Sequence, residues 1–143
     1  MFLGEYQHSL DTKGRVILPA EFRAPLAGGA VIAKGLDGCL SVYGREEFEA
    51  MAERIRETAR RGEKERRAAR SFFAGAKPVA PDKQGRVAIP QNLREFAGLE
   101  RDVIVVGIDR RIEIWDSRRW RDQDERGQTD IASAEGLEDI GII

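Results

Sequence analysis

The sequence predicts an α+β fold, mainly β, in which one small structural unit occurs twice. The nonapeptide DTKGRVILP at residues 11–19 recurs as DKQGRVAIP at residues 82–90, and five of the nine positions are identical. Each nonapeptide precedes a short helix-like segment and then two β-rich runs. Self-similarity at a fixed distance along a chain is typical of a structural duplication.

Each copy is expected to contain a strand, a short helix, a β-hairpin and a second helix. Pro19 and Pro90 suit the first helical position, where a missing N–H has no intrahelical partner. Phe22 and Leu93 would then face the core. The hairpin strands are expected near 30–33 and 39–43 in the first copy, and near 103–106 and 111–115 in the second.

A longer helical insert is expected between the two copies. Apolar residues recur at helical spacing in its first part, namely Phe48, Met51, Ala52, Ile55 and Ala59. Gly62 is expected to end that helix. A second helix over 63–74 would carry a stripe of Ala68, Ala69, Phe72 and Phe73. These stripes either pack on the β core or contact another subunit, and the two roles are compatible.

We divide the chain into a first copy at 1–50, the insert at 51–76, a second copy at 77–122 and an acidic tail at 123–143. The tail lacks hydrophobic periodicity, so we expect it to be flexible. From Asp122 to the end, the chain has seven acidic residues and one basic residue, Arg126. The net charge of -1 therefore conceals a basic body. Such a body fits an anion-binding surface, or a surface that is merely solvated.

The composition predicts a cytoplasmic protein with no membrane partner. No run of residues approaches the roughly 20 apolar residues of a membrane span. The N-terminal segment lacks the basic and apolar regions of a signal peptide. Cys39 is the single cysteine, which excludes an intramolecular disulfide.

The sequence contains no recognisable catalytic or metal-binding pattern. His8 is the single histidine and Cys39 the single cysteine, too few for a zinc site. No Gly-x-Ser-x-Gly elbow is present. Gly-Leu-Asp-Gly at 35–38 lacks the Gly-Lys-Ser/Thr ending of a phosphate-binding loop. We therefore predict no enzymatic activity, no catalytic residues, no cofactor and no metal site.

The repeated Asp-x-x-Gly-Arg-Val pattern predicts a tight turn that leads into a strand. Gly14 can adopt the positive φ that such a turn requires. Val16 and Leu18 would face one side of the strand and Arg15 and Ile17 the other, with the turn placing Arg15 at one edge and the second copy equivalent. Asp11 lies four residues before Arg15, so its carboxylate could hold the guanidinium in a bidentate pair. That pair either only fastens the turn or presents the arginine to a ligand.

The motif Asp-x-x-Gly-Arg-[Val/Ile]-x-[Ile/Leu]-Pro resembles the core motif of the SpoVT/AbrB-type DNA-binding domains. Its two copies, together with the N-terminal FLGEY, resemble the MraZ family of bacterial transcriptional regulators, which is associated with the division and cell-wall gene cluster. The resemblance covers about residues 1–120. It implies a duplicated AbrB-like β unit with swapped hairpins, with the helical insert between the copies and short flanking helices. It also implies that chains assemble into a ring.

The resemblance further implies a function and a set of site residues. The loops would bind short direct repeats in double-stranded promoter DNA. The homo-oligomer would act at the nucleoid as a repressor of its own promoter and of the division and cell-wall gene cluster. The implied DNA-binding residues are Thr12, Lys13, Gly14, Arg15, Lys83, Gln84, Gly85 and Arg86, and the implied motif-supporting residues are Asp11 and Asp82.

The tips of the two loops differ, and one alternative function stays open. Lys83 aligns with Thr12 and Gln84 aligns with Lys13, so unequal contributions to DNA binding are expected. The alternative is an antitoxin-like protein-interaction module, because AbrB-like domains also resemble the N-terminal parts of some antitoxins, where a disordered tail binds a toxin. Antitoxins usually carry one such motif per chain, whereas this chain has two.

Overall fold

The two copies of the repeat supply the same order of elements in the computed structural model, which describes all 143 residues. The first copy supplies β1 (Phe2–Ser9), β2 (Arg15–Ile17), α1 (Ala20–Arg23), the 3-10 turn η1 (Ala24–Leu26), β3 (Ala30–Lys34), the 3-10 turn η2 (Leu36–Gly38), β4 (Leu40–Gly44) and α2 (Arg45–Ala59). The second supplies β5 (Lys77–Val79), β6 (Arg86–Ala88), α4 (Gln91–Ala97), β7 (Asp102–Asp109), β8 (Arg111–Asp116) and α5 (Ser117–Ile131). Helix α3 (Glu63–Gly75) lies between the copies, and α6 (Ala134–Asp139) follows α5.

The predicted α+β class is confirmed, with 46% of the residues in helices and 29% in strands. The helices hold more residues than the strands because α2, α3 and α5 are long, whereas the strands form most of the core. No helix combines the length and the apolar character that crossing a membrane requires.

The strands of the two copies pair with each other, in two antiparallel sheets. The larger sheet has the order β1-β7-β8-β4-β3-β5, and the smaller sheet is the ribbon β2-β6. Strand β1 of the first copy lies on β7 of the second, and β5 of the second copy lies on β3 of the first. The hairpins are therefore exchanged between copies, as the predicted duplicated unit requires.

A pseudo-twofold axis relates the copies and passes through both sheets. In the ribbon, Val16 lies opposite Val87, and these residues are repeat equivalents. In the larger sheet, Ser41 lies opposite Glu113, which are also equivalent positions. Because each of these pairs joins a residue to its own counterpart, the duplication in sequence becomes a near-symmetry in space.

The main hydrophobic core lies between the ribbon and one face of the larger sheet. The ribbon contributes Val16 and Leu18 from the first copy, and both are fully buried. Ile17, between them, points outward and is 43% exposed. Phe22 and Leu93 are buried in the same core, as the sequence predicts. The period-2 alternation of the strand thus separates a core face from an outward face.

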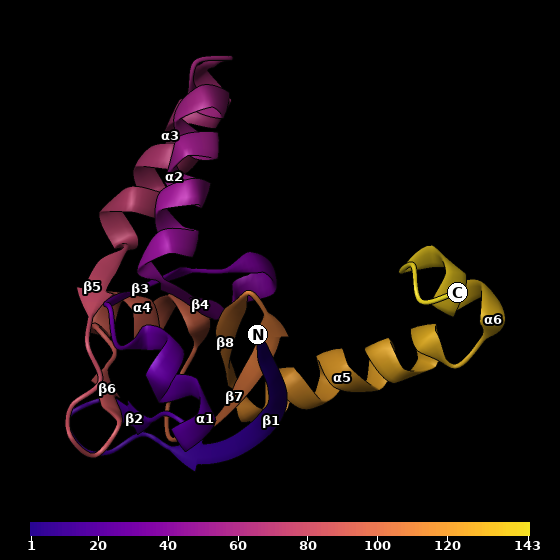
Figure 1. Ribbon diagram of the computed structural model, residues 1–143, viewed down its shortest axis with the longest axis horizontal. Coiled ribbons are helices and arrows are strands. Elements are labelled where there is room, and N and C mark those ends of the chain that lie inside the picture. Colours follow the sequence, from indigo (N-terminus) through magenta and orange to yellow (C-terminus); the bar gives the residue numbers. More distant parts are fainter.

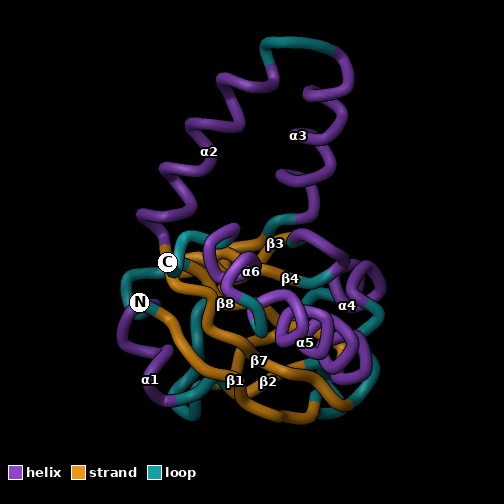
Figure 2. Tube along the Cα trace, turned by 90° about the vertical axis from the view of Figure 1, so that its right-hand side faces the viewer, coloured by secondary structure: helices purple, strands orange, loops and turns teal.

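Helices α2 and α3 form a hairpin that projects from the β body at the end opposite the β2-β6 ribbon (Figures 1 and 2). Gly62 is the N-terminal cap residue of α3, so the predicted break between the two helices is confirmed. Phe48 of α2 stacks on Phe72 of α3, with ring centroids 6.1 Å apart. The apolar stripes therefore pack partly on each other at the base of the hairpin.

The structure differs from the loose tail expected over residues 123–143. Helix α5 continues to Ile131, and α6 follows after Ser133, whose side chain caps it by accepting from the Gly136 N–H at 3.0 Å. Polar pairs one helical turn apart support α5, including Gln128 to Asp124 at 2.8 Å. Such pairs stabilise a helix without any hydrophobic period, which explains why the sequence pattern did not indicate it.

A second, smaller core covers the opposite face of the larger sheet and anchors the start of α5. It contains Cys39, Ile104, Val106 and Trp115, and Trp120 of α5 packs against it. The Trp120 indole N–H donates to a carboxylate oxygen of Glu5 at 3.0 Å. Only the first turns of α5 are held in this way, and the rest of the helix extends away from the body (Figure 1).

Replacing Leu18 by alanine should destabilise the fold far more than the same change at its neighbour Ile17. Leu18→Ala removes a fully buried side chain and should lower the free energy of unfolding by about 2–5 kcal/mol. Ile17→Ala acts on the outward face and should cost about 1 kcal/mol or less. Urea denaturation followed by circular dichroism measures both values, and equal losses would contradict the assignment of the two faces.

Candidate nucleic-acid interface

One carboxylate organises each loop that precedes a strand of the ribbon. In the first loop, Asp11 Oδ1 accepts hydrogen bonds from the backbone N–H groups of Lys13 and Arg15, both at 2.9 Å. Asp11 Oδ2 accepts from Nε of Arg15 at 2.7 Å. Gly14 has a φ of 74°, so the predicted left-handed turn is confirmed. The chain therefore turns sharply and enters β2 with Arg15 at its first position.

The second loop repeats this geometry atom for atom. Asp82 Oδ1 accepts from the backbone N–H groups of Gln84 and Arg86 at 2.9 Å, and Oδ2 accepts from Nε of Arg86 at 2.7 Å. Gly85 has a φ of 81°. The motif thus has a structural role in both copies, because its aspartate satisfies backbone donors that the turn would otherwise leave unpaired.

The expected bidentate pair between the aspartate and the arginine is not what the structure shows. Each carboxylate bonds Nε only, and the two terminal nitrogens of Arg15 and of Arg86 have no hydrogen-bond partner within the chain. The second carboxylate oxygen is occupied by backbone donors, which leaves it no lone pair directed at the guanidinium edge. The same contact therefore fastens the turn and leaves the terminal nitrogens of the arginine free for a ligand.

Hydrogen bonds keep both aspartates ionised. The backbone N–H of Arg86 is the main cause that lowers the pKa of Asp82 to about 2, and the Arg86 side chain and the Gln84 N–H act in the same direction. The pKa of Asp11 is lowered by the equivalent contacts from Arg15 and Lys13. The loops therefore keep their internal bonds at any pH near neutrality.

The ribbon places the two arginines on one outward face. Arg15 lies opposite Ala88, and Arg86 lies opposite Ile17. Arg15 and Arg86 are therefore diagonal neighbours on an antiparallel pair, with α-carbons about 7–8 Å apart. Because the strands are antiparallel, the two loops flank the ribbon at its opposite ends. This face lies at the end of the body away from the α2–α3 hairpin (Figures 1 and 2).

The tips of the loops are exposed and carry one lysine each. Thr12 and Lys13 form the first tip, and Lys83 and Gln84 form the second. All four residues are exposed to solvent. The lysine occupies the second tip position in the first loop and the first tip position in the second loop. The pseudo-twofold symmetry is therefore broken at the tips, although the supporting geometry is the same.

Two further arginines, Arg23 and Arg94, lie against these loops, and the motif did not indicate them. Arg23 Nε donates to the carbonyl oxygen of Leu18 at 3.0 Å, and Arg94 Nη1 donates to that of Ile89 at 2.6 Å. Arg23 belongs to the same repeat position as Arg94, since they are separated by the 71 residues that separate Arg15 from Arg86. Extending the repeat comparison into the short helices would have found them.

Each of these arginines covers the glycine of the other copy's loop. A Cβ at Gly14 would overlap the guanidinium of Arg94, and a Cβ at Gly85 would overlap that of Arg23. Both glycines are also buried and left-handed. Each loop thus needs glycine for its backbone conformation and for the close approach of a cation from the opposite copy.

The loops and their neighbours form a cationic surface. Its basic residues are Lys13, Arg15, Arg23, Lys83, Arg86 and Arg94. The acidic residues of the loops are Asp11 and Asp82, and each is already bonded to an arginine. A chain with a net charge of -1 can therefore present a locally positive face, because many of its acidic residues lie in the segment from Asp122 onward.

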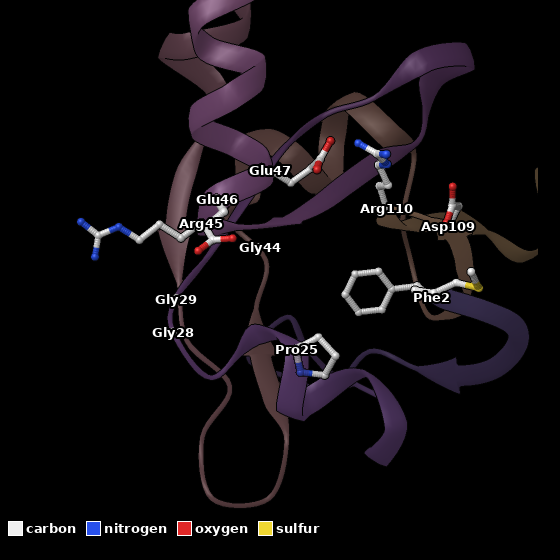
Figure 3. Close-up of a pocket in the computed structure, with 11 residues that line it drawn as sticks. Phe2, Pro25, Gly28, Gly29, Gly44, Arg45, Glu46, Glu47, Asp109 and Arg110 are labelled. Carbon is white, nitrogen blue, oxygen red and sulfur yellow. The ribbon is translucent and has the colours of Figure 1, made fainter.

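Other features of the molecule do not form a competing catalytic site. A hollow of about 720 Å³ lies between the start of α2 and the β7–β8 turn, and its charged lining mixes Arg45 and Arg110 with Glu46, Glu47 and Asp109 (Figure 3). Burial raises the pKa of the Cys39 thiol to about 12. That thiol stays protonated near neutral pH, so it is a poor nucleophile.

The contribution of Asp82 to stability should disappear in strong acid. Its folded pKa of about 2 lies below its ordinary value of 3.8, so its stabilisation is complete above that ordinary value and is lost as the pH falls toward 2. Asp82→Asn should therefore be less stable than the native chain by a constant amount above about pH 5. That difference should shrink between about pH 4 and pH 2. Urea denaturation at a series of pH values measures it, and a difference that does not change with pH would contradict the assignment.

Comparison with known proteins agrees with this architecture. The family model described as "MraZ protein, putative antitoxin-like" matches residues 1–71 and again residues 72–136, so it covers both copies. A protein of Syntrophomonas wolfei named transcriptional regulator MraZ is 44% identical over 143 residues, which span 99% of this chain and all of the relative. The protein of the same name from Acetivibrio thermocellus is 50% identical over 120 residues, 84% of each chain.

A third relative extends the comparison to another bacterium. The transcriptional regulator MraZ of Salinispora arenicola is 46% identical over 135 residues, which span 94% of this chain and 95% of the relative. Transcriptional regulators are not enzymes, in agreement with the prediction that the chain has no enzymatic activity. The matches extend through both copies of the repeat and into α5. On this evidence, the chain belongs to the MraZ family of transcriptional regulators.

Proposed function

We propose that this regulator binds double-stranded promoter DNA through the two arginine loops and represses transcription from its own promoter and from the division and cell-wall gene cluster. The observation that carries the proposal is the placement of Arg15 and Arg86 on one outward face, each with its terminal guanidinium nitrogens free. The proposed DNA-binding residues are Thr12, Lys13, Gly14, Arg15, Lys83, Gln84, Gly85 and Arg86, with Asp11 and Asp82 as supports.

The shape of the ribbon supports binding in the major groove. That groove admits a two-stranded β-ribbon, and arginine is the commonest side chain to bind guanine there, through the O6 and N7 atoms. Arg15 and Arg86 meet the requirement for two adjacent free donors, since their Nε atoms are already bonded to the aspartates. The terminal nitrogens would therefore make the contacts with the base, and the aspartate fixes the orientation of the guanidinium.

The remaining residues of the surface suit contacts with the DNA backbone. Lys13 and Lys83 are exposed and bear no ion-pair partner within the chain. Lysine and short polar side chains at such positions usually bind phosphates and fix the register of a protein on the duplex. The difference between the two tips then predicts unequal backbone contacts, with Lys13 and Gln84 at equivalent positions.

Self-association would supply the affinity that one chain lacks. A single ribbon offers few charged contacts, so its binding would be weak and sensitive to salt. We propose that several chains form a ring and that successive ribbons bind successive short direct repeats. Linked binding sites raise affinity by orders of magnitude without any new type of contact. The protein would act in the cytoplasm, at the nucleoid.

An antitoxin-like module is the second candidate. The matching family model carries the words "antitoxin-like" in its description, and the acidic C-terminal segment with exposed isoleucines could bind a partner protein. The two candidate functions predict different experimental results. Specific retardation of promoter DNA in a gel-shift assay supports the regulator, whereas co-purification with a toxin in place of DNA binding supports the antitoxin.

Arg15→Ala should abolish specific DNA binding while the fold and the assembly stay intact. A bidentate arginine–guanine contact discriminates by about 1–3 kcal/mol, and this loss is repeated in every subunit of an assembly. Arg86→Ala should weaken binding as well. Arg110→Ala, which removes an exposed arginine on the β7–β8 turn, is the matched control and should bind like the native chain. Fluorescence anisotropy with promoter DNA at fixed salt measures all three.

The opposite outcome has a specific structural meaning. If Arg15→Ala unfolds the protein, as judged by circular dichroism, the Asp–Arg pair only fastens the turn. If Arg15→Ala folds and still binds the promoter like Arg110→Ala, the arginine loops do not read the DNA.

Affinity should fall steeply as operator repeats are deleted one at a time. Each repeat removed takes away one bound ribbon, so the apparent dissociation constant should rise by about tenfold or more per deletion. Anisotropy with duplexes of constant length, in which single repeats are scrambled, measures this dependence. Equal affinity for one repeat and for several would rule out binding by a multivalent ring.

A further inference from the structure

The end of the chain presents apolar side chains on an acidic segment. We call residues 130–143 the C-terminal arm. Its exposed apolar residues are Ile131, Ile140, Ile142 and Ile143, each at least 44% exposed. The arm also contains four acidic residues and no basic residue. Exposed isoleucines close together along the chain favour contact with another protein surface, because water is a poor environment for them.

The arm is ordered and is held away from the body. Ser133 caps α6, and Gly141 turns the chain with a φ of 83°. The backbone N–H of Ile142 donates to the carbonyl oxygen of Leu137 at 2.9 Å, which closes the turn after α6. Helix α5 has 15 residues and is therefore about 22 Å long. It leads away from the α2–α3 hairpin of its own chain (Figures 1 and 2).

The α2–α3 hairpin carries an apolar groove with basic residues in its lining. Its apolar floor is formed by Met51, Ile55, Ala68 and Ala69, and the hollow has a volume of about 360 Å³. The other lining residues are Arg54, Thr58, Lys64 and Glu65.

The turn between the two helices and the first part of α3 are basic. Residues 60–70 contain six basic side chains against two acidic ones. Arg54, Arg61 and Lys64 form no ion pair within the chain. The charged residues that line the groove are Arg54, Lys64 and Glu65, none of which forms an ion pair within the chain, so the edge of the apolar floor has a net positive charge.

We propose that the C-terminal arm of one chain docks into the α2–α3 groove of a neighbouring copy. The isoleucines after α6 would cover the apolar floor, and Glu135, Glu138 and Asp139 would lie against the free cations at the edge. Opposite charges on two apolar surfaces favour this pairing and exclude like-charged alternatives, such as arm on arm. The direction of α5 favours docking between chains over docking within one chain.

This contact is head-to-tail, because each copy contributes one arm and one groove of different shape. Repetition of such a contact closes into a ring when the rotation between copies is suitable. The inference rests on the proposed self-association and names the surfaces that would produce it. It leaves the arginine loops free, since the groove lies at the other end of the molecule (Figures 1 and 2).

Cysteine cross-linking between differently tagged full-length chains tests the proposal. In a Cys39→Ala background, chains with Ile140→Cys are co-expressed with chains that carry Met51→Cys, and the disulfide-linked heterodimer is measured on a non-reducing gel. The matched control replaces Met51→Cys by Leu36→Cys, an exposed position that does not line the groove. The proposal expects efficient cross-linking to residue 51 and none to residue 36.

Charge reversal provides an independent readout. Arg54→Glu, Arg61→Glu and Lys64→Glu together should raise the concentration at which chains assemble by at least tenfold, measured by mass photometry. Glu135→Lys, Glu138→Lys and Asp139→Lys together should do the same. A chain with all six changes should assemble like the native protein, because the opposite charges face each other again.

Three results would overturn the proposal. One is the absence of a cross-link between 140 and 51 in an assembled protein, and another is the failure of the six-fold variant to assemble. The third is preferential cross-linking of Ile140→Cys to Lys13→Cys, which would place the arm on the arginine loops. Arg15→Ala should leave both readouts unchanged, so a failure of DNA binding is distinguished from a failure of arm docking.

Discussion

The fold depends on the antiparallel pairing of the two copies with each other. Strand β1 has its only sheet neighbour in the second copy, and β5 has its only neighbour in the first. The β2-β6 ribbon likewise takes one strand from each copy, with Val16 opposite Val87 at its centre. Because Arg15 and Arg86 open these two strands, the pairing that completes the core also places both arginines on one outward face. Stability and the proposed DNA-binding surface therefore share a single cause.

In each loop, the aspartate and the arginine stabilise the turn, and the remaining basic side chains are the ones that we propose to attract DNA. The aspartate and the arginine of a loop form a pair with no net charge. The pair therefore orients the guanidinium but adds little electrostatic attraction for a phosphate. The positive field of the surface then comes from the tip lysines and from Arg23 and Arg94, which reach across to the opposite copy. In the proposed function, such a surface would attract phosphates broadly and leave two fixed guanidinium edges to discriminate among bases. The low pKa of Asp82 keeps this arrangement independent of pH near neutrality.

The features that could be predicted from the sequence are those that depend on the repeat and on the alternation of side chains along a strand. The short helices, the hairpins, the face shared by Val16 and Leu18, and the left-handed Gly14 follow from local sequence. Only one strand was expected before each short helix, so the outer strands β1 and β5 were missed. Arg23 and Arg94 were missed because they lie outside the repeated nonapeptide, although they occupy equivalent repeat positions; their contacts with the loop of the other copy arise from the pairing of the copies. Helix α5 was missed beyond its first turns because short-range polar pairs support it in place of a hydrophobic stripe. Each arginine bonds its aspartate through Nε alone because backbone N–H groups bind the other carboxylate oxygen. The spacing of residues in the sequence does not reveal this competition.

The arginine face, the basic hairpin and the acidic arm occupy separate parts of the molecule, so DNA binding and assembly can operate together (Figure 1). The central claim is that the β2-β6 ribbons of several chains bind short direct repeats in DNA through Arg15 and Arg86. Hydroxyl-radical footprinting of the full-length protein on the DNA upstream of its own gene, at a salt concentration of about 0.15 M, tests it most directly. The account predicts short protected segments that recur at the spacing of the direct repeats. Uniform protection without a period, or no protection under conditions in which the protein is assembled, would contradict it.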